Sequence, residues 1–175
     1  SYLNERLFGP GLYRAMRELK TAFDPRGLMN PGKIVDPGPP DTDLRFGPGY
    51  RPYKLKTYLD WSPDEGFPGA AEMCSGQGVC RKLGEGIMCP SYMATRDERD
   101  TTRARANALR AVLSGKAGKE FLTGNEMRET FDLCISCKAC KSECPSAVDA
   151  TKMKSEFLAH YHDAHGLPIR DRIFG

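Results

Sequence analysis

The chain has 175 residues, of which 39% are hydrophobic and 28% charged, and 26 Lys and Arg against 23 Asp and Glu leave a net charge of +3. Positive and negative residues are mixed along the sequence, which excludes the basic block typical of a nucleic-acid-binding protein. No stretch approaches the roughly 20 consecutive apolar residues of a membrane span, and the first residues lack the pattern of a secretion signal. We therefore expect a cytoplasmic protein with no membrane span and no nucleic-acid partner.

The first predicted element is an amphipathic helix from Pro10 to Phe23. Asp24-Pro25 ends this helix, because the residue before a proline avoids the helical region. The sequence starts at Ser1, without an initiating Met, and enters the helix almost at once, so we expect a fragment of a longer protein. Apolar side chains recur at helical spacing along one face: Leu12, Met16, Leu19 and Phe23.

A segment rich in turn-forming residues comes next. Residues 31 to 70 contain eight Pro and six Gly, which favours a linker or a chain laid over a surface. Disordered linkers are poor in aromatic residues, so we expect this segment to be anchored, with Trp61 as one anchor. Its aromatic residues are Phe46, Tyr50, Tyr53, Tyr58, Trp61 and Phe67.

The remainder of the chain has helical patterns. One helix is predicted over 103–113, and a shorter one over 127–133 leads into the later cysteines. The last helix is predicted to start near Ser146, with Asp149 three residues on as in a capping box, and to end at Gly166. No segment alternates apolar and polar residues long enough for a sheet, so the fold class is expected to be mainly α.

Two groups of polar residues favour structural roles. The five arginines between residues 96 and 110 are interleaved with Asp and Glu, which indicates an ion-paired helix start rather than a phosphate site. His160, His162 and His165 resemble a metal-binding group, but on a helix His160 and His162 point apart. We expect them to lie at the end of a surface helix.

The later cysteine run carries the strongest chemical signal. Cys134, Cys137, Cys140 and Cys144 have the spacing C-x2-C-x2-C-x3-C and are followed by Pro145. In ferredoxin-type sites the first three cysteines of this pattern bind one 4Fe-4S cluster, and the fourth binds the other cluster of a two-cluster protein. A structural zinc site is the alternative, but it usually separates two C-x2-C pairs by a dozen or more residues.

An earlier run is an incomplete copy of the later one. Cys74 and Cys80 repeat the spacing of Cys134 and Cys140, and Cys89 is followed by proline as Cys144 is, but Gln77 occupies the middle position. Crossed ligation would add Cys89 to the later three thiolates and Cys144 to the earlier two. The site of Cys74, Cys80 and Cys144 then suits a 3Fe-4S cluster, or a 4Fe-4S cluster with one ligand that is not cysteine. Alternatively, a single cluster is closed by Cys144, and Cys74 and Cys80 are spare thiols.

Two stretches resemble a known enzyme family. The first runs from Phe23 to Ile34 (FDPRGLMNPGKI) and resembles the closing segment of flavin-linked dehydrogenases of the vanillyl-alcohol oxidase class, which act on D-lactate, glycolate and D-2-hydroxyglutarate. The second comprises residues 88–98 (MCPSYMATRDE) and 134–145, and is similar to the iron–sulfur part of the large members of this class. In those members a flavin domain, a helical ferredoxin-like domain and a C-terminal cysteine-rich domain share one chain.

This resemblance implies three parts. Residues 1–36 would be the C-terminal tail of an FAD-linked oxidase domain, residues 37–72 a draped linker, and residues 73–175 a helical ferredoxin-like iron–sulfur domain. The family places the Asn-Pro-Gly-Lys turn near the flavin, so Asn30, Gly32 and Lys33 are candidates for FAD contact, with a purely structural turn as the alternative.

The resemblance also implies a role in electron transfer. The module would relay electrons from the FAD of a 2-hydroxyacid dehydrogenase, in the same parent chain, to a downstream cysteine-rich domain, a quinone or an electron carrier. The fragment alone is not expected to be catalytic. Two other interpretations remain open, namely an iron–sulfur cluster with a purely structural role and a zinc-stabilised interaction module.

Overall fold

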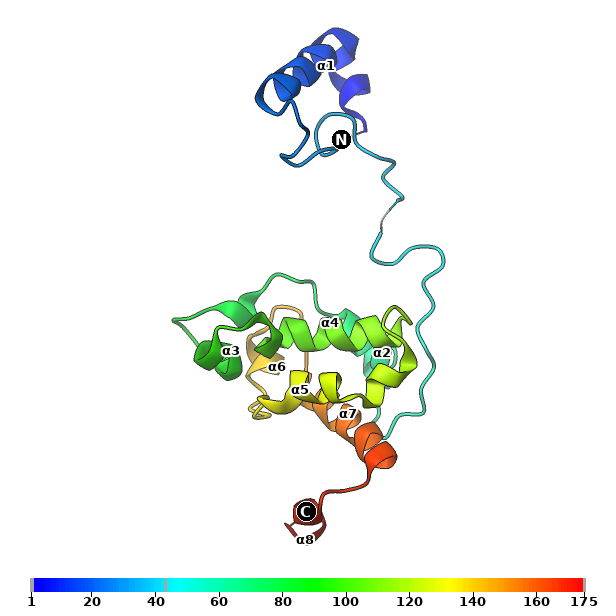
Figure 1. The fold of residues 1–175 in the computed structure, drawn as a ribbon, viewed down its shortest axis with the longest axis vertical. Coiled ribbons are helices and arrows are strands. Elements are labelled where there is room, and N and C mark those ends of the chain that lie inside the picture. Colours follow the sequence, from blue (N-terminus) through cyan, green and yellow to red (C-terminus); the bar gives the residue numbers. More distant parts are fainter. Residues whose placement is uncertain (1, 43, 175) are drawn as a thin grey trace. The chain divides into compact units, whose positions relative to one another are not determined.

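The computed structural model describes residues 2–42 and 44–174. Residues 1, 43 and 175 lie outside this description. They belong to the predicted flavin-domain tail, the predicted linker and the predicted iron–sulfur domain, respectively. The chain divides after Tyr50 into two compact units, which we describe separately (Figure 1).

Helices are the regular structure of both units, and no strand occurs in the part of the chain that the structure describes. The predicted mainly α fold class is therefore confirmed. The α-helices are α1 (Asn4–Phe23), α2 (Phe67–Glu72), α3 (Pro90–Thr95), α4 (Thr102–Leu113), α5 (Asn125–Asp132), α6 (Ala139–Glu143), α7 (Ala150–His165) and α8 (Ile169–Phe174). Short 3-10 helices are η1 (Ser62–Asp64), η2 (Val79–Arg81), η3 (Glu98–Asp100) and η4 (Lys119–Thr123).

The first unit consists of α1 and the turns that follow it. The helix ends at Phe23 as predicted, but it begins before Pro10 and is kinked at Gly9, whose φ of 77° is not helical. Proline at the next position suits the start of a new helical run after this kink. Beyond the helix, the hydroxyl of buried Tyr13 accepts a hydrogen bond of 2.8 Å from the Asp36 N–H, which ties the following turns to α1.

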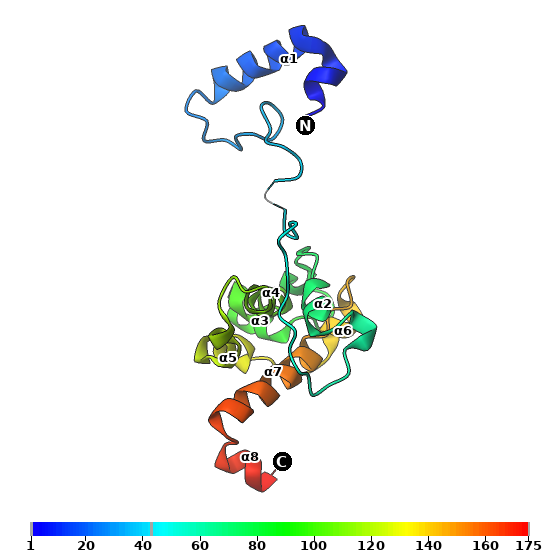
Figure 2. The same cartoon turned by 90° about the vertical axis from the view of Figure 1, so that its right-hand side faces the viewer.

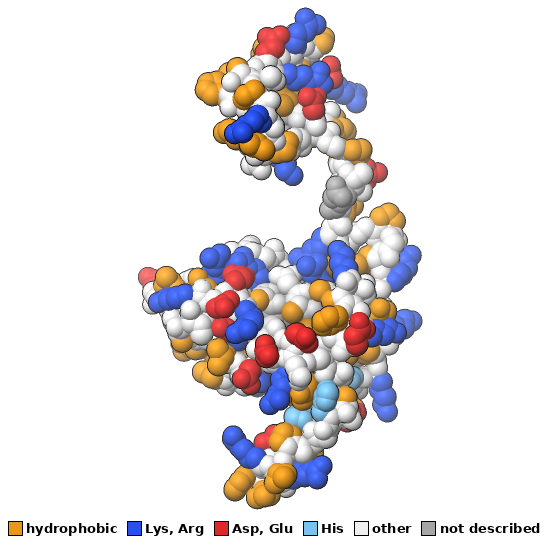
Figure 3. Space-filling model, viewed as in Figure 1, with side chains coloured by type: hydrophobic (Ala, Val, Ile, Leu, Met, Phe, Trp, Pro, Cys, Tyr) orange, Lys and Arg blue, Asp and Glu red, His pale blue; other side chains and the backbone are white. Residues whose placement is uncertain are grey.

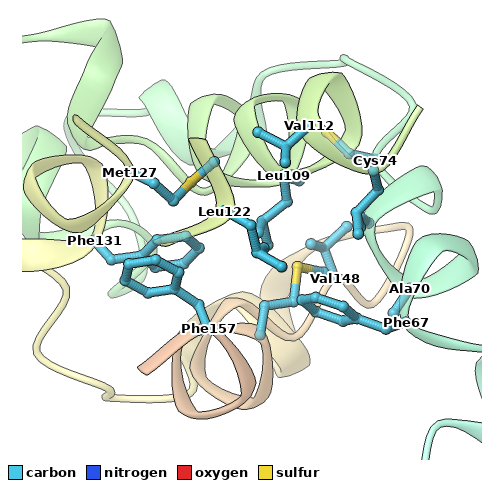
Figure 4. Packing of buried hydrophobic residues seen from close by; sticks show 14 of the residues in the cluster. Phe67, Ala70, Cys74, Leu109, Val112, Leu122, Met127, Phe131, Val148 and Phe157 are labelled. Carbon is cyan, nitrogen blue, oxygen red and sulfur yellow. The ribbon is translucent and has the colours of Figure 1, made fainter. Parts of the chain in front are cut away.

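The core of the second unit lies among α2, α4, α5 and α7. Helix α4 contacts each of the other three, and α7 runs beneath α4 and α5 in both views (Figures 1 and 2). The rings of Phe131 on α5 and Phe157 on α7 stack with centroids 5.3 Å apart (Figure 4). Such burial of large apolar side chains is the main stabilising contribution available to a unit with so many turns.

The segment before α2 is anchored to this core. The buried carboxylate of Glu156 on α7 accepts hydrogen bonds from the backbone N–H groups of Tyr58 and Leu59 at 2.9 Å each, and from Trp61 Nε1 at 3.0 Å. The Trp61 side chain is in the core, beside Phe67. Trp61 is thus the anchor that its sequence context predicts.

The predicted helices over 103–113 and before Cys134 are confirmed by α4 and α5, whereas the last helix differs from its prediction. It begins at Ala150, because Asp149 is the N-cap and accepts a hydrogen bond of 2.9 Å from the Lys152 N–H. The expected start near Ser146 is wrong, since the Ser146 hydroxyl contacts Ser75 Oγ instead of capping a helix. Gly166 ends α7 as predicted, but the short α8 beyond Pro168 was not expected.

The surface of the second unit carries both signs of charge. Lysine, arginine, aspartate and glutamate side chains are interspersed over the face seen in Figure 3, in agreement with the mixed charge pattern of the sequence. Within residues 2–42 and 44–174, no helix is both long enough and apolar enough to cross a membrane.

Candidate metal centre

The seven cysteines surround two cavities in the second unit. The first cavity is lined by Cys74, Cys80 and Cys144. The second is lined by Cys89, Cys134, Cys137 and Cys140. Each cavity therefore combines thiols from the earlier and the later cysteine run, and none of the seven is in a disulfide.

Local backbone geometry brings the four thiols of the second cavity together. Cys89 is the residue before α3, whose first residue is Pro90, a position where the fixed φ of proline suits a helix start. Between Cys134 and Cys140 the chain turns tightly through Ser136 and Lys138, which have positive φ values of 56° and 62°. This conformation costs about 1 kcal/mol or more for residues other than glycine, so the surrounding structure holds it in place.

A buried arginine lies against the second cavity. Arg105, 1% exposed, donates from Nε to the Thr130 carbonyl at 3.0 Å, and its other two nitrogens lie 3.6 Å from Cys89 Sγ and 3.2 Å from Ser91 Oγ. Its guanidinium forms none of the ion pairs found among residues 2–42 and 44–174. A buried cation without an anionic partner is costly. An iron–sulfur cluster held by thiolates would supply the missing negative charge.

The neighbours of the Cys89 thiol change its pKa. Burial by itself raises its pKa, but contacts with Ser91, the Tyr92 N–H and the Arg105 guanidinium outweigh burial, so the pKa of Cys89 lies below its usual value. A lowered pKa favours the thiolate, which is the form that binds metals. The donor set and the charge around the second cavity therefore fit a cluster.

The first cavity is built around a glycine-rich turn. Gly76 and Gly78 both have positive φ and lead into η2, which carries Cys80 into the core. Burial raises the pKa of the Cys80 thiol. Gln77 lines the same cavity and is exposed, so the position that lacks a cysteine faces both the cavity and solvent.

Arg103 lies beside the first cavity and is paired with an acidic side chain. Its Nε and one terminal nitrogen donate to the Glu98 carboxylate at 2.8 and 2.9 Å, and the other terminal nitrogen donates to the Gly76 carbonyl at 3.0 Å. The ion-paired helix start predicted from the arginine-rich run is therefore present at Arg103. Arg105, from the same run, has a different environment, which the sequence interpretation missed.

Glu143 links the two cysteine runs. Its carboxylate accepts from Lys82 Nζ at 2.6 Å, from the Ile87 N–H at 2.8 Å and from the Met88 N–H at 3.2 Å. These hydrogen bonds lower the pKa of Glu143 to about 2. These hydrogen bonds hold the loop before Cys89 against Glu143, the last residue of α6.

Two side chains lie between the cavities. Met88 and Thr102, both almost fully buried, line the first cavity as well as the second. Met88 also packs in one apolar cluster with Cys80 of the first cavity and with Cys89 of the second. The cavities are therefore neighbours separated by protein side chains.

The thiols around each cavity differ in their exposure. In the second cavity Cys137 is exposed, Cys134 is half-buried, and Cys89 and Cys140 are buried. In the first cavity Cys144 is half-buried, and Cys74 and Cys80 are buried. Among the described residues, no three His, Cys, Asp or Glu side chains converge on a position for a single metal ion.

The three residues proposed for flavin contact lie in the first unit. Asn30, Gly32 and Lys33 line an open groove beside α1. Asp24 organises the turn before them, because its carboxylate accepts from the Leu28 and Met29 N–H groups at 2.8 Å each and pairs with Lys20. Flavin contact by Asn30, Gly32 and Lys33 stays a prediction.

Comparison with known families identifies the class of each part. Residues 73–149, which contain all seven cysteines, match the family described as a 4Fe-4S dicluster domain. Residues 2–34 match the C-terminal domain of FAD linked oxidases. The chain is thus similar to the end of an FAD-linked oxidase domain in its first part and to an iron–sulfur domain in its second, which supports a 4Fe-4S cluster and FAD as cofactors.

Three curated proteins similar to this chain are D-2-hydroxyglutarate dehydrogenases. The chain is 31% identical over 203 residues to a D-2-hydroxyglutarate dehydrogenase of Pseudomonas putida, and 27% identical to proteins of the same name from Escherichia coli (201 residues) and Haemophilus influenzae (213 residues). The alignments cover 94%, 95% and 99% of this chain. The chain spans about a fifth of the length of these relatives, 20% in each case. No solved structure matches.

The chain is therefore similar, over nearly its whole length, to one segment of the large FAD-linked hydroxyacid dehydrogenases. The family resemblance predicted from residues 23–34, 88–98 and 134–145 is confirmed by these matches. The type of any second cluster and the electron acceptor are not among the findings and belong to the proposal below.

Proposed function

We propose that the second unit holds two iron–sulfur clusters and carries electrons one at a time away from the FAD of a 2-hydroxyacid dehydrogenase. The observation that carries this proposal is the grouping of seven thiols around two adjacent cavities, one of them next to a buried arginine without an acidic partner. The match of residues 73–149 to a 4Fe-4S dicluster domain supports the same conclusion.

The ligands follow from the lining of each cavity. Cys89, Cys134, Cys137 and Cys140 would hold a 4Fe-4S cluster in the second cavity. Cys74, Cys80 and Cys144 would hold a 3Fe-4S cluster, or a 4Fe-4S cluster with a fourth ligand other than cysteine, in the first cavity. Cys144 then belongs to the cavity of the earlier run, as the crossed pattern of two-cluster ferredoxins requires.

The protein's contribution is to position and shield these groups. A bound iron–sulfur cluster supplies reversible one-electron chemistry at a potential set by its surroundings. The thiolates bind the irons, Met88 and Thr102 separate the two cavities, and Glu143 fixes the loop before Cys89. The seven cysteines are ligands in this proposal, not nucleophiles, so we expect no dehydrogenase turnover from residues 1–175 alone.

The rest of the electron route lies in other parts of a parent chain. FAD would be bound mainly by a flavin domain of that chain, with Asn30, Gly32 and Lys33 as contacts at the turn after α1. The names of the relatives make D-2-hydroxyglutarate the first substrate to test. A downstream cysteine-rich domain, a quinone or a cytoplasmic carrier protein would take the electrons.

Metal and sulfide analysis tests this proposal directly. Protein purified without oxygen should contain iron and acid-labile sulfide, and its electron paramagnetic resonance spectra, as isolated and after reduction, should contain two cluster signals. Cys137→Ser should alter the signal of the second cavity, and Cys74→Ser that of the first. A colourless preparation that contains zinc and no sulfide would contradict the proposal.

A further inference from the structure

Arg105 is a buried cation whose hydrogen-bond partners include no carboxylate. Lysine and arginine are almost never fully buried unless they are paired, yet this guanidinium is 1% exposed and meets a carbonyl, a hydroxyl and a thiol. The thiol belongs to Cys89, a proposed ligand of the second cavity. The negative charge that would balance Arg105 is therefore expected inside that cavity.

The arginine of the first cavity provides the comparison. Arg103 comes from the same helix, two residues earlier, but two of its nitrogens bind the Glu98 carboxylate. Arg81 also pairs with this carboxylate, at 3.3 Å, so Glu98 is shared by two arginines. Arg103 is therefore ion-paired, whereas Arg105 forms no ion pair among residues 2–42 and 44–174.

We propose that the Arg105 guanidinium is the counter-charge of the cluster in the second cavity and raises the reduction potential of that cluster. Reduction adds one electron, so a nearby fixed positive charge stabilises the reduced form more than the oxidised form. Hydrogen bonds toward the ligand sulfur act in the same direction. This inference rests on the proposed function, because it requires a cluster in the second cavity.

Burial makes the effect of Arg105 distinguishable from that of surface charges. Lys138 and Lys141 are exposed near the same thiols, and at high ionic strength their influence is screened beyond a few ångström. A buried charge in contact with Cys89 Sγ is screened much less. A potential shift caused by Arg105 should therefore persist in concentrated salt.

The test is a potentiometric titration of the natural full-length protein, followed by electron paramagnetic resonance. Arg105→Gln removes the charge, Arg105→Lys retains it, and Arg110→Gln is the matched control on the same helix, at a position that lines neither cavity. Arg105→Gln should lower the midpoint potential of the second-cavity cluster by roughly 59 mV, equivalent to a tenfold change in the ratio of reduced to oxidised form. Arg105→Lys should stay near the wild-type potential, and Arg110→Gln should not change it.

Three outcomes decide the question. Equal potentials for Arg105→Gln and Arg110→Gln would overturn the inference while leaving the clusters in place. If Arg105→Gln binds no iron, the midpoint potential of Arg105→Lys is the deciding measurement. A potential of Arg105→Lys far below that of the wild type would overturn the inference, because it would mean that hydrogen-bond geometry and not charge sets the potential. Wild-type protein without iron would overturn the proposed function and this inference together.

Discussion

Gln77 is the residue that most clearly separates the two cysteine runs. It stands where the later run has Cys137, and it lines the first cavity from an exposed position without displacing the neighbouring thiols. The residue therefore determines how many thiolates the first cavity offers.

Gln77→Cys should complete that cavity. A fourth thiolate favours a 4Fe-4S cluster over a three-iron cluster, so the iron content should rise and any three-iron signal should disappear from the electron paramagnetic resonance spectrum of the oxidised protein. Gln77→Ala is the matched control and should leave both quantities unchanged. A three-iron signal that persists unchanged in Gln77→Cys would contradict the three-thiolate site.

Glu156 is a second residue whose role depends on burial. Burial opposes the charged form, but hydrogen bonds from Trp61 and from the Tyr58 and Leu59 N–H groups outweigh it, so the pKa of Glu156 lies below its usual value of 4.5. Because the folded-state pKa is lowered, the stabilisation is present above pH 4.5 and is lost as the pH falls through the folded-state pKa.

Glu156→Gln should therefore destabilise the protein mainly above pH 4.5. One amide oxygen cannot replace two carboxylate oxygens, so the free energy of unfolding at pH 7 should fall by about 2 kcal/mol. Chemical denaturation at several pH values measures this, with the exposed Glu126→Gln as control. A difference between wild type and Glu156→Gln that does not shrink on acidification would count against the carboxylate's role.

Arg105 shows which signals at the residue scale are present in the sequence and which are not. It lies four residues before Leu109 and seven before Val112, so it belongs to the buried face of α4 by spacing alone. The surrounding Asp and Glu residues made a solvated ion pair the natural interpretation. The contact with Cys89 depends on tertiary packing and has no counterpart in the local pattern.

At the scale of elements, the loop from Lys82 to Met88 is held in place by hydrogen bonds to the Glu143 carboxylate. Gly86 has a φ of 78°, and a Cβ added there would overlap the Glu143 and Lys82 side chains. Glycine therefore suits this position, because another residue would be strained at this φ and would displace the ends of the Glu143 and Lys82 side chains.

Gly86→Ala should open this loop. The positive φ and the overlap together should cost about 1 kcal/mol or more, and release of iron to a chelator should become faster because Cys89 follows the loop. Gly84→Ala is the matched control, since no atom lies within 4 Å of its added Cβ and its φ is not positive. Thermal unfolding and chelator kinetics measure both effects, and equal behaviour of the two variants would contradict the role of the loop.

Helix boundaries were predictable where a local stop signal decides them. Asp24-Pro25 ends α1 and Gly166 ends α7, as the sequence indicates. The start of α7 was misjudged because Ser146 and Asp149 are both good N-caps, and the choice between them depends on Cys144 and its turn. Helix α8 was not predicted because it begins directly after Pro168, which was interpreted together with Gly166 as the end of the last helix.

At the scale of the molecule, the second unit is held together by a limited apolar core around two cavities. A bound metal cluster would add to the stability of such a unit, because metal binding and folding are coupled. The cysteine spacing indicates crossed ligation, with thiols from both runs at each site, and this assignment stays a prediction. The placement of Met88 and Thr102 between the sites could not be derived from spacing.

Removal of iron should therefore loosen the second unit as a whole. Ligand binding and folding are coupled in metal-stabilised domains, so anaerobic treatment with a chelator should expose Trp61, the single tryptophan of the chain. Its fluorescence emission should shift to longer wavelength, and reconstitution with iron and sulfide should reverse the shift. Emission that is unchanged after complete loss of iron would mean that the apolar core suffices.

The exchange of cysteines between the two runs has a consequence for biosynthesis. The ribosome completes Cys74, Cys80 and Cys89 well before Cys134 leaves the exit tunnel, yet each cavity needs thiols from both runs. With the proposed ligands, the second site cannot close before Cys140 is made, nor the first before Cys144. The early thiols would then have to stay reduced and unoccupied until the later run is made, so metal insertion would follow the synthesis of that run.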